Sequence, residues 1–192
     1  MKTLYVLRHG NTFDPGDTVR RVGRGTDLPL SASGRKQAEA LARALEGRVD
    51  AVLSSPLRRT RETAEALGLP VRLDDRLLEI DYGPDEGRPE AEVVARLGAD
   101  AIAAWDADAL VPDGWVVDPD AIRRAWTALL GEAADRTAIV TSNGTARFLL
   151  DVCDHDGAER KLRTGSYGIV TGEPGAWRIT AWNRRPALDG PA

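Results

Sequence analysis

The stretch LYVLRHGNTFDP (residues 4–15) decides the fold and raises the question of function. Residues 4–7 are a short run of β-formers, which is typical of a central strand buried on both faces. We expect that strand to end in Arg8, His9 and Gly10, which are a cation, an imidazole and a residue without a Cβ. Because these are not ordinary turn residues, the carboxyl end of this strand is a candidate functional site.

The composition is that of an ordinary globular domain. Of the 192 residues, 42% are hydrophobic and 29% are charged, which excludes a disordered chain. The net charge of -4 argues against a nucleic-acid partner, since such proteins are commonly basic. The single cysteine, Cys153, cannot form an internal disulfide and suits a reducing cytoplasm. No apolar run approaches the roughly 20 residues of a membrane span, and no signal peptide precedes the first strand, so we expect a cytoplasmic protein without a membrane partner.

Strand and helix signals alternate along the whole chain. Further strands are expected at residues 51–53, 71–73, 137–141, 166–171 and 177–182. Helices are expected at about residues 34–46, 56–67, 90–97, 119–134 and 145–152. This alternation predicts an α/β fold, a three-layer α/β/α sandwich with a mostly parallel central sheet. We expect a single domain over residues 1–192, with a variable insert at about 88–118.

Polar side chains follow several of these strands. Arg8 and His9 end the first strand, SSPLRRT (54–60) follows the second, and SNG (142–144) follows the late one. In sheets of this kind, ligands bind outside the carboxyl ends of the strands. Guanidinium groups and free backbone N–H groups at helix N-termini match the oxygens of a phosphate. The sequence therefore predicts an anion site at this edge of the sheet.

Four motifs resemble those of the histidine phosphatase superfamily, which has a phosphoglycerate mutase-like fold. They are LRHGNT (7–12), GRGTDLPLSASGRKQAEALA (23–42), SSPLRRTRETAE (54–65) and LLEIDYGPDEG (77–87). The resemblance is strong over residues 4–87 and rests on the order of elements beyond them. It implies that His9 is a nucleophile that forms a phosphohistidine, which requires a neutral imidazole. It also implies that Arg8 and Arg59, rather than Arg58, hold the phosphoryl oxygens.

The resemblance assigns a carboxylate as the acid that protonates the leaving oxygen and later activates water. Glu79 matches that position. Asp81, Asp85 and Glu86 lie in the same acidic loop and remain alternatives. Further side chains expected to line the entrance of the site are Asn11, Arg20, Arg21 and Thr26.

The chain departs from the family pattern after its late strand. The family has a second pocket histidine in V-S-H-G-G-V-x-R, whereas this chain has VTSNGTAR (140–147). An alignment without gaps on Arg147 puts Ser142 in the histidine position, and a shift of one residue puts Asn143 there. Either side chain could donate a hydrogen bond to a phosphoryl oxygen, but neither carries a charge. Loss of one such donor typically costs about 10²–10³ in rate.

Two functions follow from these motifs. The first is a phosphomonoesterase of the histidine acid phosphatase type, which acts on a small-molecule phosphomonoester through His9 with no metal ion and no cofactor. The second is a catalytically impaired phosphate-binding protein or scaffold. Retention of His9 and Glu79 favours the enzyme, and the missing histidine favours the alternative. The motifs specify neither the substrate nor the oligomeric state.

Overall fold

The computed structural model describes residues 1–153, 155 and 159–188, and its centre is a six-stranded sheet in the order β3-β2-β4-β1-β5-β6. Four neighbouring strands run parallel, namely β1 (Lys2–Arg8), β2 (Ala51–Ser54), β3 (Val71–Leu73) and β4 (Thr137–Thr141). Strand β5 (Tyr167–Glu173) runs antiparallel to β1, and β6 (Ala176–Arg184) runs antiparallel to β5. The mostly parallel sheet predicted from the sequence is thus confirmed.

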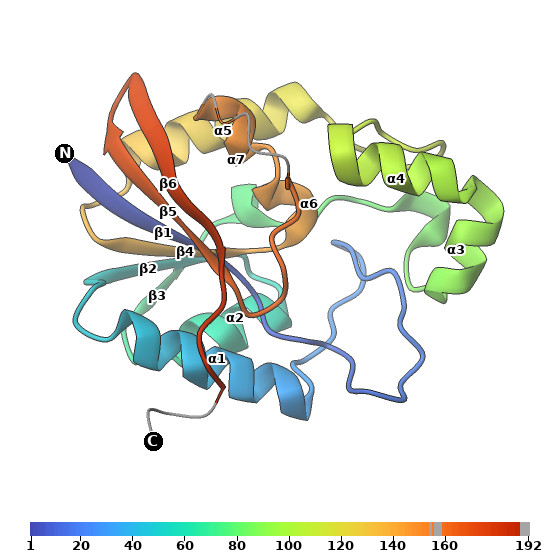
Figure 1. Ribbon diagram of the computed structural model, residues 1–192, viewed down its shortest axis with the longest axis horizontal. Coiled ribbons are helices and arrows are strands. Elements are labelled where there is room, and N and C mark those ends of the chain that lie inside the picture. Colours follow the sequence, from blue (N-terminus) through green and yellow to red (C-terminus); the bar gives the residue numbers. More distant parts are fainter. Residues whose placement is uncertain (154, 156–158, 189–192) are drawn as a thin grey trace.

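Helices cover both faces of this sheet (Figure 1). One face carries α1 (Ala32–Leu45) and α2 (Arg58–Glu65), and the other carries α5 (Pro119–Glu132), α6 (Asn143–Ala146) and α7 (Leu149–Val152). Strand β1 shows why three layers form, since its consecutive side chains enter opposite cores. Tyr5 and Leu7 pack in the core that contains Leu41, whereas Leu4 and Val6 pack in the core that contains Trp126. The predicted α/β/α sandwich is therefore confirmed.

The helix starts follow from local sequence. Ser31 precedes α1, and its hydroxyl accepts a hydrogen bond from the Gly34 N–H at 3.1 Å. Asp118 caps α5 in the same way by accepting from the Ala121 N–H, with Pro119 as the first helical residue. Such caps satisfy backbone donors that have no partner within the helix.

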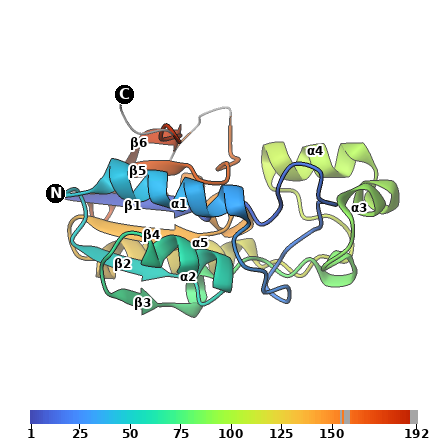
Figure 2. The same ribbon diagram turned by 90° about the horizontal axis from the view of Figure 1, so that it is seen from below.

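The segment expected to be an insert projects beyond the carboxyl ends of the parallel strands (Figure 2). It contains α3 (Glu90–Leu97) and α4 (Ala99–Asp108). Gly98 separates these two helices at a φ of +86°, which L side chains rarely adopt. A helix was expected in this part of the chain over residues 90–97, and the structure adds a second helix around Trp105.

Two smaller differences concern local elements. The single helix expected over residues 145–152 is divided into α6 and α7. Two 3-10 turns, Asp75–Leu77 and Gly83–Asp85, occupy the loop between β3 and α3.

Within the described ranges, no helix combines the length and apolarity needed to cross a membrane.

Candidate active site

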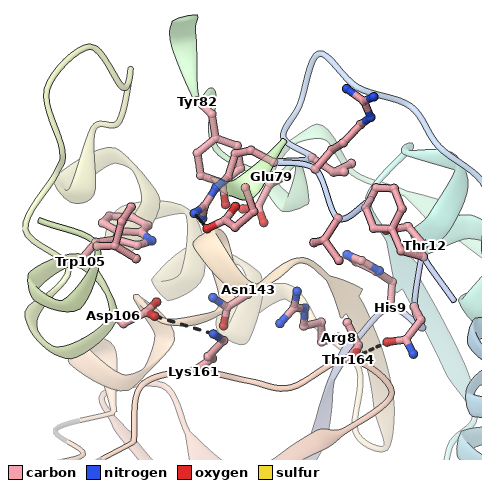
Figure 3. Close-up of a pocket in the computed structure, with 18 residues that line it drawn as sticks. Arg8, His9, Thr12, Glu79, Tyr82, Trp105, Asp106, Asn143, Lys161 and Thr164 are labelled. Atoms are coloured by element: carbon pink, nitrogen blue, oxygen red, sulfur yellow. Dashed lines mark hydrogen bonds and ion pairs between the residues drawn. The ribbon is translucent and has the colours of Figure 1, made fainter. Parts of the chain in front are cut away.

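A cavity of about 400 Å³ lies at the carboxyl end of β1, between the sandwich and the insert (Figure 3). Arg8, His9 and Asn143 line it from the sheet side, and Glu79 and Trp105 line it from other elements. The structure therefore brings together residues from β1, the loop after β3, α4 and α6. This is the sheet edge at which the sequence predicted an anion site.

His9 is held in one orientation at this edge. Its Nδ1 lies 2.7 Å from the Gly10 carbonyl oxygen, so Nδ1 carries the proton and donates it. Its Nε2 then accepts a hydrogen bond from Arg59 Nε at 3.2 Å. Burial, followed by the positive charges of Arg59 and Arg8, lowers the pKa of His9 well below its ordinary value, although the Gly10 contact opposes this shift. The ring is thus neutral, as a nucleophilic imidazole must be.

The glycine after His9 has a steric reason. A Cβ at Gly10 would overlap the Gly34 carbonyl oxygen, and a Cβ at Gly34 would overlap the Asn11 carbonyl oxygen. The end of β1 and the start of α1 therefore touch backbone to backbone. The Gly10 N–H also donates to the Thr63 hydroxyl of α2 at 3.1 Å, which fixes this turn from a second helix.

Arg59 is fully buried and does not line the cavity. Its terminal N–H groups donate to the carbonyl oxygens of Thr26 at 2.9 Å and Gly23 at 3.1 Å. Burial lowers the pKa of Arg59, whereas the charge of Glu79 raises it. The structure therefore places the Arg59 charge against His9 Nε2 and uses its other donors to hold the loop that precedes α1.

Arg8 and Asn143 are both fixed by one residue. The Leu162 carbonyl oxygen accepts from Arg8 Nη1 at 2.9 Å, and the Leu162 N–H donates to Asn143 Oδ1 at 2.9 Å. Because Oδ1 is used as an acceptor, the amide Nδ2 of Asn143 is the end left to donate toward the cavity. Burial lowers the pKa of Arg8, and the Glu79 carboxylate opposes that shift.

Ser142 is placed differently from Asn143. It is the residue before α6, it is fully buried, and it does not line the cavity. Its hydroxyl makes no hydrogen bond within the described part of the chain. Of the two residues that could occupy the position of the second histidine, Asn143 is the one that faces the cavity.

Glu79 is 5% exposed and accepts two backbone hydrogen bonds. Its Oε1 accepts from the Ile80 N–H at 2.9 Å, and its Oε2 accepts from the Gly144 N–H at 3.1 Å. The carboxylate is thereby anchored at both oxygens on the wall of the cavity that also contains His9.

The three alternative carboxylates have other partners and do not line the cavity. Asp81 accepts from the Gly83 N–H at 2.8 Å. Asp85 accepts from Trp115 Nε1 at 2.8 Å and from the Arg96 guanidinium. Glu86 accepts from the Thr26 hydroxyl at 2.7 Å. Glu79 is therefore the member of this set with access to a substrate.

The expected entrance residues divide into two groups. The cavity is lined by Asn11, Arg20 and Arg21. Thr26 does not line it, and its hydroxyl donates a hydrogen bond to Glu86. Arg21 pairs with Glu90 and lies 5.2 Å from the centre of the Tyr82 ring. The loop that contains these residues is thus joined to α3 and to the acidic loop.

Sequence reasoning missed several lining residues. Trp105 and Asp106 of α4 reach the cavity from the insert, and Lys161 and Thr164 reach it from the segment before β5. Lys161 Nζ lies 3.7 Å from Asp106 Oδ2 (Figure 3). The Asp106–Lys161 pair has no local signal in the sequence, since it joins residues far apart in the chain. In the described part of the chain, no group of three or more His, Cys, Asp or Glu side chains is arranged to hold a metal ion.

Comparison with known proteins agrees with this geometry. A model of the histidine phosphatase superfamily (branch 1) matches residues 4–185. A probable phosphoglycerate mutase of Escherichia fergusonii, GpmB, is 41% identical over 93 residues, which are 46% of this chain and 42% of that protein. The match therefore spans less than half of that relative's length. The probable phosphoglycerate mutase GpmB of Serratia proteamaculans is 28% identical over 95% of this chain and 90% of that protein.

Solved structures extend the likeness to the whole fold. A mycobacterial glucosyl-3-phosphoglycerate phosphatase, in complex with VO3, superposes with a TM-score of 0.81 at 28% sequence identity. The superposition covers 96% of this chain and 100% of that chain. Because the family model spans nearly the whole sequence and the fold is shared along its length, the chain belongs to the histidine phosphatase superfamily, among relatives that include phosphatases and mutases.

Proposed function

We propose that this protein hydrolyses small-molecule phosphomonoesters without a metal ion, through a phosphohistidine on His9. The observation that carries the proposal is a neutral imidazole with its tautomer fixed by Gly10, which lines one cavity with Arg8 and Glu79. A site that only binds phosphate needs neither a nucleophile nor an acid. Both groups are present and both are held by hydrogen bonds.

The reaction has two displacements at phosphorus. In the first, His9 Nε2 gives up the hydrogen bond from Arg59 and forms a bond to phosphorus while the ester P–O bond breaks, and protonated Glu79 gives its proton to the leaving oxygen. In the second, the Glu79 carboxylate takes a proton from water, the water oxygen attacks phosphorus, and the P–Nε2 bond breaks. Inorganic phosphate leaves, and His9 returns to its neutral form.

The phosphoryl charge requires donors aimed at its oxygens. Arg8 supplies a positive charge from the end of β1, and Asn143 supplies amide N–H groups from the start of α6. Arg59 contributes its charge next to Nε2. Asn143 thus stands in for an imidazole donor, as a group that faces the cavity but carries no charge.

The test is to trap the intermediate. Wild-type protein is mixed with a panel of ³²P-labelled phosphomonoesters in EDTA, quenched and assayed for an acid-labile, base-stable phosphoenzyme and for released phosphate. We expect label on the wild type and none on His9→Ala. His155→Ala is the matched control, because His155 is the only other histidine and does not line the cavity.

Three results would contradict the proposal. Turnover that EDTA abolishes and Mg²⁺ restores would require a metal-dependent reaction. Binding of phosphate without turnover of any ester would support the alternative, an impaired phosphate-binding protein whose Asn143 replaces a charged donor. Transfer of the label to a second hydroxyl of the substrate, rather than to water, would indicate a mutase.

A further inference from the structure

Four cationic side chains line the cavity, and they differ in how they are already engaged. Arg8 donates to the Leu162 carbonyl oxygen within the phosphoryl end. Arg21 is paired with Glu90, and its guanidinium lies 5.2 Å from the centre of the Tyr82 ring and 5.1 Å from the centre of the Trp115 ring. Arg20 donates to the Gly87 carbonyl oxygen at 3.0 Å, and Lys161 is the fourth. Among these four, Lys161 is the one beside a carboxylate that is shared with another cation.

That carboxylate is Asp106. Its Oδ1 lies 3.3 Å from Arg147 Nη2, and its Oδ2 lies 3.7 Å from Lys161 Nζ. One negative charge therefore faces two positive charges. Arg147 is fully buried, donates to the Trp105 carbonyl oxygen and lies 4.1 Å from the centre of the Trp105 ring, so it cannot leave this position. The cluster of Asp106, Arg147 and Lys161 therefore has one net positive charge, and Lys161 is the cation of this corner of the cavity that is able to offer it to a ligand.

Lys161 is free to use that charge. Its side chain is 50% exposed, and the 3.7 Å separation from Asp106 is longer than a hydrogen bond. Its backbone, in contrast, is fixed. The Lys161 carbonyl oxygen accepts from Asn183 Nδ2 at 2.6 Å, and the next residue, Leu162, holds both Arg8 and Asn143. An ammonium on a flexible stem is thus attached to the rigid frame of the phosphoryl site.

The position within the cavity defines which part of a substrate Lys161 meets. In Figure 3, Lys161 and Asp106 lie at one end, His9 lies at the other, and Asn143 and Arg8 lie between them. A phosphoryl group on His9 would therefore leave Lys161 near the far end of the alcohol portion. A second anion placed there would complete the charge balance of the corner.

We propose that Lys161 binds a second anionic group, a carboxylate or a second phosphate, on the alcohol portion of the substrate, with Asp106 as the counter-charge that limits its affinity. The inference rests on the proposed function, because it takes His9 as the position of the phosphoryl group. It makes Lys161 and Asp106 determinants of specificity, and it restricts the preferred substrates to phosphomonoesters with at least one additional negative charge.

The experiment compares matched esters that differ in that charge. The carboxylate pair is 3-phosphoglycerate and glycerol 3-phosphate, and the second-phosphate pair is glucose 1,6-bisphosphate and glucose 6-phosphate. kcat and KM are measured for wild type, Lys161→Met and Asp106→Asn, with p-nitrophenyl phosphate as a common reference. The matched control is Arg163→Met, which removes a positive charge two residues along the chain from Lys161. The Arg163 side chain pairs with Glu159 and does not line the cavity.

We expect Lys161→Met to raise KM for the more acidic member of a pair about tenfold, the value of one charge-assisted contact, with little change in kcat or in the KM of the less acidic member. Asp106→Asn should lower that KM about two- to threefold, because it removes the counter-charge beside Lys161. The amide oxygen of the new side chain can still accept from Arg147, so the position of Arg147 should be kept. Arg163→Met should leave both ratios unchanged. The pair that responds identifies the second anion as a carboxylate or a phosphate.

Equal effects of Lys161→Met on both members of each pair would overturn the proposal. So would selectivity that is lost in Arg20→Gln instead, because Arg20 would then be the binding cation. Failure of the proposed function has a different signature, namely no turnover of any ester by the wild type. In that case, calorimetric binding of the same ester pairs with and without Lys161→Met still measures the ratio, and an unchanged ratio overturns the inference.

Discussion

Gly144 and Glu79 are in direct contact. The Gly144 N–H donates to Glu79 Oε2 at 3.1 Å, and a Cβ at position 144 would overlap Glu79 Oε1. The neighbouring Thr145 hydroxyl donates to the Leu78 carbonyl oxygen, so the start of α6 is joined to this loop at both Leu78 and Glu79. One turn of chain therefore turns the Asn143 amide toward the cavity and holds the Glu79 carboxylate, which is the acid of the proposed mechanism.

The first prediction concerns this contact. Gly144→Ala should displace the Glu79 carboxylate and lower kcat about 10²-fold, the lower range of what a general acid contributes. Because an alkoxide needs that proton more than a nitrophenolate does, the loss should be larger for alkyl phosphates than for p-nitrophenyl phosphate. Steady-state kinetics on both substrates, with Glu79→Gln for comparison, measures this difference.

The control for that substitution is Gly131→Ala in α5, where a Cβ would meet nothing within 4 Å. It should leave kcat unchanged. An equal loss on both substrates in Gly144→Ala would mean that the turn is distorted as a whole and that Glu79 is not selectively displaced.

The second prediction separates Asn143 from Ser142. Asn143→Ala removes the amide donor that faces the cavity and should lower kcat about 10²-fold. Ser142→Ala removes a hydroxyl that makes no hydrogen bond within the described residues, and it should change kcat less than about twofold, within the error of one weak contact. Phosphate release by both variants is the measurement. A large loss in Ser142→Ala with none in Asn143→Ala would reverse the assignment.

The third prediction is a pH dependence of stability that comes from His9. Burial holds the pKa of His9 well below 6.5, so the folded protein leaves this ring neutral where the unfolded chain protonates it. Stability from this residue is therefore complete above pH 6.5 and is lost as the pH falls below it, at up to about 1.4 kcal/mol per pH unit.

Urea unfolding of wild type and His9→Gln between about pH 7.5 and 5.5, on either side of the ordinary histidine pKa, tests this sign. Subtracting the free energy of unfolding of the variant from that of the wild type cancels the contribution of the carboxylates, which are the same in both proteins. We expect the free energy of unfolding of the wild type to fall more steeply than that of the variant. Parallel slopes would show that His9 is protonated in the folded protein.

The fourth prediction concerns the attachment of the insert. Asp85 is fully buried and accepts from Trp115 Nε1 and from Arg96. Asp85→Asn should weaken these bonds and destabilise the protein by about 1–3 kcal/mol. It should also raise KM, since Trp115 supports the Arg21 wall of the cavity. The control is Asp113→Asn, which changes a 99% exposed carboxylate 3.9 Å from the same arginine. Urea unfolding and KM of the two variants should therefore differ.

The fold was largely predictable from the sequence because its signals are local. The β1 run, the cap at Ser31 and the proline at position 119 each act within a few residues, and the elements they predict are present. The division of residues 145–152 into two helices was not predictable in the same way. The break falls at Arg147 and Phe148, and the buried Arg147 side chain extends to Trp105 in the insert, which is distant in the sequence.

The candidate site shows the same boundary between local and distant information. Arg8 and His9 were selected as candidates because they stand at the carboxyl end of a strand. Choosing between Ser142 and Asn143 as the residue that faces the cavity required the contact of Asn143 with Leu162. That contact is not visible in an alignment of residues 140–147. Arg59 was expected at the phosphoryl oxygens, and only the structure shows its donors on the carbonyl groups of the preceding loop. Nothing in the sequence marked Lys161 and Asp106 as site residues, because the two are distant in the chain and come together only in the folded protein.

The backbone contact of Gly10 with Gly34 has a consequence for how this protein can evolve. No side chain separates these two glycines, so there is nothing there to exchange for a slightly larger or smaller residue. Any substitution at either glycine introduces a Cβ into an occupied position. The placement of His9 therefore leaves no room for a side chain at either glycine, and we expect changes in substrate preference to be tolerated instead in α3, α4 and the segment around Lys161.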